Sequence, residues 1–269
     1  MSTTAAGASG TSRDDSITVC AIAVIGAILA DVLHEALGHA VPALLLGDQW
    51  GNLSTVAWSS AFDSRVVSAG GTIVNIVTGL AMWIALRRAT RASSQTRYCL
   101  LVCCAFNLFA GTGYFFYSGV ADIGDWAAVI RGMQPHWVWR GLLIVVGMAA
   151  YYGSVLLVGQ GYRKYVGVSA DESGRMRRLT IFPYVTALVL LGVAGLLNTI
   201  GVRLVFESAL AASAGANSGL LWLVFYIPKE LAPERAGESI ARSYGWIAVA
   251  CVMAIGFIFV LGPGITLHR

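Results

Sequence analysis

The chain has 269 residues, of which 57% are hydrophobic and only 12% are charged, and its formal net charge is +4. Soluble globular domains carry about 25% charged residues, so this composition excludes an ordinary water-soluble enzyme. It also argues against nucleic-acid binding as the reason for the positive charge. We expect a polytopic membrane protein.

The first 16 residues, MSTTAAGASGTSRDDS, are small and polar without periodicity, and we expect a disordered tail there. Beyond the tail, the sequence contains six or seven apolar runs of the roughly 20 residues that cross a bilayer as a helix. They lie at residues 17–46, 66–86, 98–119, 141–161, 180–201, 205–227 and 244–264. The run at 205–227 is the weakest, because Glu207, Asn217 and several small residues interrupt it.

The predicted fold is therefore all-α, a multi-pass membrane protein with six to seven transmembrane helices. We divide it into the tail at 1–16, a metal-binding core of three helices at 17–140, and accessory helices at 141–269. We expect the plasma (cytoplasmic) membrane as its location.

The linkers predict how the chain is oriented. Twelve of the 18 Lys and Arg residues lie in the three most polar linkers, at residues 87–97, 162–179 and 228–243. By the positive-inside rule these linkers face the cytoplasm, which with seven spans places the amino terminus inside and the carboxyl terminus outside.

Two histidines and a glutamate interrupt the first apolar run, in the sequence HEALGH at residues 34–39. An ionisable side chain in hydrocarbon costs roughly 2.5–3.5 kcal/mol even on lenient insertion scales, so its presence indicates a functional site. Zinc held by two histidines and an acidic ligand activates water at neutral pH, and a neighbouring glutamate can accept the proton. We therefore expect His34 and His39 to bind zinc and Glu35 to act as general base.

The spacing of these histidines is unusual, because they are five residues apart rather than four. On a regular helix that spacing separates the side chains by about 140°, too far for both to reach one ion. A single π-bulge would return them to one face, and Gly38 makes such a distortion cheap. The alternative is that each ring bonds to a neighbouring helix. Asp31, one turn earlier, could orient a histidine.

The segment HEALGHAVPALLLG resembles the first motif of the site-2 protease family of intramembrane zinc metalloproteases, with one inserted residue. The same longer spacing occurs in the zinc motif of the dipeptidyl peptidase III family, which resembles this chain only in that hexamer. Downstream, SAGGTIVNIVTGLAMWIAL is similar to the Gly-Pro-x-x-Asn segment of site-2 proteases. This resemblance implies that Asn75 lies near the substrate, while close helix packing is the alternative explanation of the segment.

The family's third element is an aspartate that completes the zinc sphere, and the segment after the third run offers Asp122 and Asp125. Neither stands in the family's Leu-Asp-Gly context. We favour Asp125, since Gly-Asp-Trp before a short apolar run resembles the family's aspartate, and keep Asp122 as the reserve. The alternative for Asp125 is helix capping. The first and third spans run in the same direction, so these aspartates should approach the histidines.

The loop at 47–65 contains β-formers, and we expect a hairpin there that offers an edge to an extended substrate. The resemblance places this loop in the cytoplasm, whereas the count of basic residues places it outside. Both orientations stay open at this point.

The resemblance implies a zinc metalloprotease that cleaves a peptide bond in or near the bilayer, with Zn²⁺ as cofactor. Its partners would be a membrane protein or peptide substrate and the lipid bilayer, with no nucleic acid. The alternatives are a membrane transporter or metal-binding protein without hydrolytic activity, and a catalytically inactive scaffold relative. Nitrogen and carboxylate ligands also suit iron or cobalt.

Overall fold

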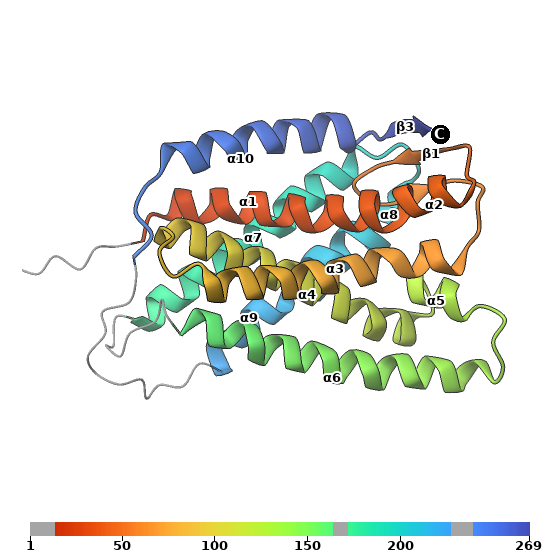
Figure 1. Ribbon diagram of the computed structural model, residues 1–269, viewed down its shortest axis with the longest axis horizontal. Helices are drawn as coiled ribbons and strands as arrows, with labels where there is room; N and C mark the ends of the chain where they lie inside the picture. Colours follow the sequence, from red (N-terminus) through yellow and green to blue (C-terminus); the bar gives the residue numbers. More distant parts are fainter. Residues whose placement is uncertain (1–13, 164–171, 227–238) are drawn as a thin grey trace, which may run out of the picture.

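The computed structural model describes residues 14–163, 172–226 and 239–269 and shows an all-α bundle with one small sheet. Within the described residues, six helices are long and apolar enough to cross a membrane, as expected of a multi-pass membrane protein. They comprise residues Ser16–Leu46, Arg65–Arg88, Ser94–Ala121, His136–Tyr162, Gly174–Leu196 and Tyr244–Leu261. Figure 1 shows them side by side along the long axis, with the sheet at one end.

The first span is one continuous helix in three parts, α1 (Ser16–Val32), the π-helix η1 (Leu33–Ala40) and α2 (Val41–Leu46). It begins where the Asp15 carboxylate accepts a hydrogen bond from Thr18 N at 2.9 Å, which satisfies one of the helix's free N–H groups. It ends at Gly47, whose φ of 120° a residue with a side chain rarely adopts.

The next elements carry the chain back and forth across the bundle. They are the strands β1 (Trp50–Leu53) and β2 (Trp58–Ser59), then α3 (Arg65–Arg88), α4 (Ser94–Ala121), the short α5 (Asp125–Ile130) and α6 (His136–Tyr162). The hairpin expected in the loop at 47–65 is confirmed, because β1 and β2 pair antiparallel.

The carboxyl-terminal half is less regular. Helix α7 (Glu172–Leu196) begins inside the segment 162–179 that we expected to be a linker. After it come α8 (Val202–Leu204), the π-helix η2 (Val205–Gly215), the 3₁₀ turn η3 (Ala216–Ser218), α9 (Gly219–Tyr226), α10 (Tyr244–Gly256), the π-helix η4 (Phe257–Leu261) and β3 (Ile265–His268). The described part of the sixth apolar run is thus helical, but the type of helix changes along it from π to 3₁₀ to α.

One end of the bundle, which we call the basic end, gathers the described parts of the basic linkers. Asp15 N donates to Ile240 O at 2.7 Å, and Ser94 Oγ donates to Ser239 O at 2.8 Å. At the opposite end, the site end, β1 pairs with the carboxyl-terminal β3 in a sheet of order β2-β1-β3. The two described ends of the chain therefore lie at opposite ends of the bundle, Asp14 at the basic end and β3 at the site end.

A single hydrophobic core crosses both halves of the sequence. Its largest fully buried side chains include Tyr98, Phe106 and Phe109 on α4, Tyr162 on α6 and Leu179 on α7. Tyr98 and Tyr162 both donate their hydroxyls to Leu179 O, at 2.7 and 3.2 Å, so these buried polar groups are satisfied. The segments 17–140 and 141–269 consequently share one core and are not separate packing units.

The end of the expected tail belongs to this fold, while residues 1–13 lie outside the described part of the chain. Asp14, whose side chain is 1% exposed, binds Nε and Nη2 of Arg175 at 2.6 and 3.0 Å. Its Oδ1 also accepts from Ile240 N at 2.8 Å. The Asp14 carboxylate thus links the start of α1 to α7 and to the segment that precedes α10.

Substitution of Asp14 by alanine is expected to destabilise the protein by about 3–5 kcal/mol, because it removes the carboxylate that pairs with the largely buried guanidinium of Arg175. Thermal unfolding in detergent measures the effect. Asp63→Ala is the control. The Asp63 side chain is 79% exposed and its Oδ2 lies 3.5 Å from Nη1 of Arg131, whose side chain is 70% exposed, so this ion pair should contribute little to stability. Equal melting temperatures for the two variants would contradict the expectation.

Candidate metal centre

The π-helix η1 brings the two histidines of the HEALGH motif together. The expected π-turn is confirmed, and it extends over Leu33–Ala40. The rings of His34 and His39 lie with their centroids 4.9 Å apart. Because a π-helix advances by more residues per turn than an α-helix, a spacing of five residues returns to the same face.

Two local features favour the wide turn at this place. Pro42 follows Gly38 by four residues and has no N–H to donate to the Gly38 carbonyl, and its ring would collide with that carbonyl in a regular helix. Gly38 also lies directly against the backbone of Gly70 and Gly71 on α3, where a side chain on any of the three would collide. The sequence thus lets the helix widen and lets α3 approach it closely.

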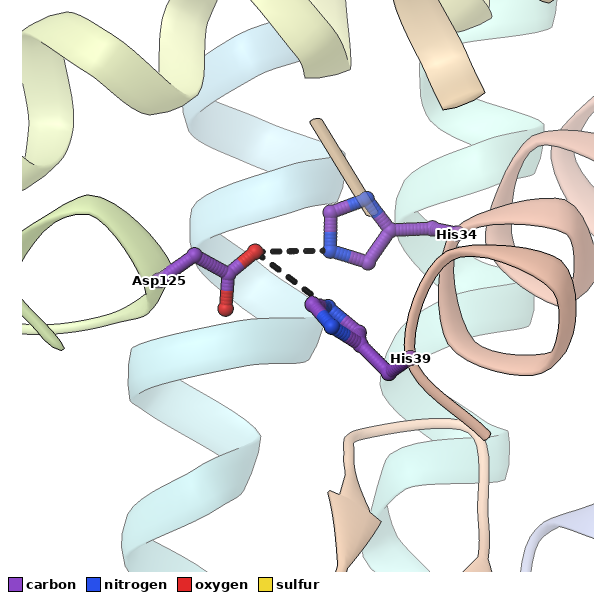
Figure 2. Close-up of side chains that lie close together, drawn as sticks. All are labelled: His34, His39 and Asp125. Atoms are coloured by element: carbon purple, nitrogen blue, oxygen red, sulfur yellow. Dashed lines mark ion pairs between the residues drawn. The ribbon is translucent and has the colours of Figure 1, made fainter. Parts of the chain in front are cut away.

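Asp125 reaches the histidines from α5, as Figure 2 shows. Its Oδ2 lies 3.1 Å from His34 Nε2 and 3.3 Å from His39 Nε2, and all three ligand atoms lie within 4.8 Å of one another. Asp125 is the first residue of α5 and Gly124 is the cap, so the alternative of helix capping does not describe its side chain. The positive φ of Gly124, 79°, turns the chain into this position.

The distances fit a shared ion. Ligand atoms about 2.0–2.2 Å from a tetrahedral zinc lie about 3.3–3.6 Å from one another. The two separations between histidine and aspartate, 3.1 and 3.3 Å, come near this range, and the two imidazole nitrogens lie within 4.8 Å of each other. His34 Nε2 and Asp125 Oδ2 are both buried, yet neither has a hydrogen bond of normal geometry within the described structure. The donor set of two imidazole nitrogens and one carboxylate therefore fits a metal ion.

The hydrogen bonding around the cluster supports this arrangement. His39 Nδ1 donates to Val67 O at 2.7 Å. In the neutral imidazole this places the lone pair on Nε2, the nitrogen that lies nearest Asp125, and metal-bound histidines commonly have such a partner on their other nitrogen. Burial by itself would raise the pKa of the Asp125 carboxyl, but the imidazoles of His39 and His34 hold that pKa below its ordinary value. Asp125 is thus anionic at neutral pH.

Glu35 lies between the histidines on η1 and is 7% exposed. Its Oε2 accepts a hydrogen bond from Trp58 N of the edge strand β2 at 2.7 Å. An open cavity of about 270 Å³ reaches this glutamate, His39 and Asp125 from the site end. We call it the open cavity. A group that enters this cavity would meet the Glu35 carboxylate together with the side chains of His39 and Asp125.

A second and smaller space, the inner cavity, continues from His34 and Glu35 along α1. Its volume is about 40 Å³, and its walls include Asp31, Asn75, Tyr114 and Asn217. A cavity of this size holds one or a few waters and no peptide backbone. Asn75 lines this inner cavity and does not line the open cavity, and its role beside a substrate stays a prediction.

The structure places Asp122, the reserve ligand, outside the cluster. Asp122 ends α4 with a φ of 57°, and its carboxylate binds His136 Nε2 at 3.0 Å and lies 3.6 Å from Arg140. The left-handed turn at this residue directs its side chain toward α6, while Gly124 redirects the chain so that Asp125 faces the histidines. Asp31 likewise makes no hydrogen bond or ion pair to either histidine.

Sequence reasoning missed two contributors to the site. Tyr114 on α4 stacks on His34 with centroids 5.3 Å apart and lines both cavities. The Trp58 backbone, which holds Glu35, carries no signal of this role in its residue type. Tyr114 stands in an aromatic run whose pattern does not distinguish it from its neighbours, so only the packing of α4 against η1 identifies it.

Comparison with known proteins assigns this chain to no family. No family model, no curated protein and no solved structure matches the chain. The likeness to site-2 proteases therefore rests on three short motifs.

Proposed function

We propose that this protein is a zinc-dependent metalloendopeptidase that hydrolyses a peptide bond in or next to the bilayer. The observation that carries the proposal is the convergence of His34, His39 and Asp125 on one point, with Glu35 beside them at the end of an open cavity. Zinc is the preferred ion because two histidines and one carboxylate with an open position form its usual hydrolytic site.

In this proposal the side chains of the site have the following roles. A bound zinc ion would supply the Lewis acidity that makes water nucleophilic at neutral pH. Glu35 would accept the proton from that water and then donate it to the leaving amine. The Trp58 N–H that binds Oε2 keeps the carboxylate in place and leaves Oε1 without a hydrogen bond from the described residues. Asn75 is given no step in the hydrolysis, because it lines the inner cavity and not the open one.

The substrate would be an extended peptide from a membrane protein. β2 is one of the two edge strands of the sheet, and its Trp58 lines the open cavity. An extended peptide could add to such an edge through main-chain hydrogen bonds. A transmembrane helix would have to unwind before it could bind in this way.

Elemental analysis of the purified protein tests the metal centre. We expect about one zinc per chain in the wild type and less than about 0.1 in a His34→Ala, His39→Ala double variant, because the remaining carboxylate alone binds zinc weakly. Asp125→Ala should also lose metal, and Asp122→Ala is its matched control, which should keep it. Equal zinc in the double variant and the wild type would end the proposal.

Two other functions are separated by further outcomes. Metal flux in vesicles that survives Glu35→Gln, together with no cleavage by the wild type, would favour a transporter. Absence of bound metal in a folded wild-type protein would favour an inactive scaffold.

A further inference from the structure

The inner cavity contains polar groups that the proposed hydrolysis does not use. Asp31 on α1, Asn75 on α3 and Asn217 in η3 all line it. Asn75 and Asn217 are 1% and 4% exposed, and the amide oxygen of each is buried without a hydrogen-bond partner among the described residues. Leaving a buried acceptor unsatisfied costs about 1–3 kcal/mol. Asn107 Oδ1 on α4 is buried without a partner in the described structure too but lines neither cavity, so only the two acceptors that share one space are candidates for holding a ligand.

The helix that supplies Asn217 is interrupted at this depth. It changes from the π-helix η2 to the 3₁₀ turn η3 and then to α9 within Val205–Tyr226. Irregular backbone inside a membrane protein is tolerated where it lines a cavity, and broken helices supply ion ligands in many transporters. The break therefore adds a second reason to look for an ion in this cavity.

The side chains around the two cavities indicate the charge of that ion. Asp31, Glu35 and Asp125 are carboxylates, while no Lys or Arg lines either cavity. Asp31 makes no ion pair within the described chain, and beside it Asn75 and Asn217 offer only neutral amide oxygens. A carboxylate at this place in hydrocarbon would need a positive charge beside it. One cation of single charge would balance that carboxylate.

We propose that the inner cavity binds one monovalent metal cation of the Na⁺ class, through the Asp31 carboxylate and the amide oxygens of Asn75 and Asn217. Oxygen ligands of this kind suit hard cations, and a volume of about 40 Å³ admits an ion with a water but no organic cation. The bound ion would join α1, α3 and η3. This site goes beyond the proposed hydrolysis and does not depend on it.

Thermal unfolding in detergent tests the site. Wild-type protein is compared in 150 mM NaCl and in choline chloride of equal ionic strength, with and without a zinc chelator. We expect Na⁺ to raise the melting temperature by about 3 °C or more, because a ligand that binds only the folded state stabilises it. The shift should persist after chelation, since Asp31 and the two amides are separate from the histidine site, so failure here and failure of the zinc proposal are distinguishable.

Variants and direct binding complete the experiment. Asp31→Asn and Asn217→Ala should each abolish the Na⁺-dependent shift and reduce binding of radioactive ²²Na⁺ at least 10-fold from about one ion per chain. Asn107→Ala is the matched control, because Asn107 is fully buried on α4 and bonds Cys103 O but does not line the cavity. It should lower the melting temperature and keep the shift.

Two results would overturn the proposal. The first is an equal melting temperature in Na⁺ and choline together with no ²²Na⁺ bound by the wild type, which would mean that Asp31 carries a proton and that water fills the cavity. The second is a Na⁺ effect that both variants retain, which would place the ion elsewhere.

Discussion

Replacement of Glu35 by glutamine is expected to leave about one zinc per chain and to lower peptide hydrolysis by about 10²–10⁴-fold, the usual contribution of a general base. The amide keeps the size of the side chain and can still accept a hydrogen bond from Trp58 N, but it cannot take a proton from water. A pool of labelled apolar peptides in detergent, with products identified by mass spectrometry, measures the rate. Elemental analysis of the same samples measures the zinc.

Glu207→Gln is the matched control for this experiment. Glu207 also lines the open cavity, but its Oε1 binds Arg203 Nε at 2.6 Å one helical turn away. We expect the control to cleave within about threefold of the wild type. Wild-type rates from Glu35→Gln would remove Glu35 from the mechanism, and equal losses in both variants would show that the effect is one of charge in the cavity rather than proton transfer.

Substitution of Gly71 by alanine is expected to lower zinc affinity at least 10-fold without a change at any ligand. A Cβ at this position would lie 2.5 Å from Nε2 of both His34 and His39, the two atoms that lie nearest Asp125. The imidazoles or α3 would have to move, and misplacement of ligands by their surroundings typically costs 10–100-fold in affinity. Zinc titration against a competing chelator measures the change.

Gly153→Ala controls for the general effect of alanine in a membrane helix, because nothing lies within 4 Å of a Cβ there. It should bind zinc as the wild type does and unfold at the same or a higher temperature. Helix content by circular dichroism confirms that Gly71→Ala is folded when its zinc is measured. Unchanged zinc affinity in that folded variant would contradict the arrangement of the two histidines against α3.

The sequence by itself determined the membrane architecture. Apolar runs of about 20 residues have few alternatives to helices in a bilayer, because every backbone N–H and C=O must be satisfied internally. The same logic singled out His34, Glu35 and His39, since three ionisable groups in one apolar run require a reason. The spacing of five residues then left two outcomes, and the π-turn was the one that could bring both rings to one ion. The polar and small residues of the sixth run indicated that its helix would be irregular.

Only the tertiary structure decided which aspartate joins the histidines and what lies beside them. Asp122 and Asp125 are three residues apart, and the backbone angles at Asp122 and Gly124 direct one carboxylate toward His136 and the other toward η1. Asn75 and Asn217 come from helices far apart in sequence and line the same inner cavity. Such details follow from how α3, α4 and the segment 202–226 pack against η1, and no local pattern of residue types encodes the contacts between distant segments.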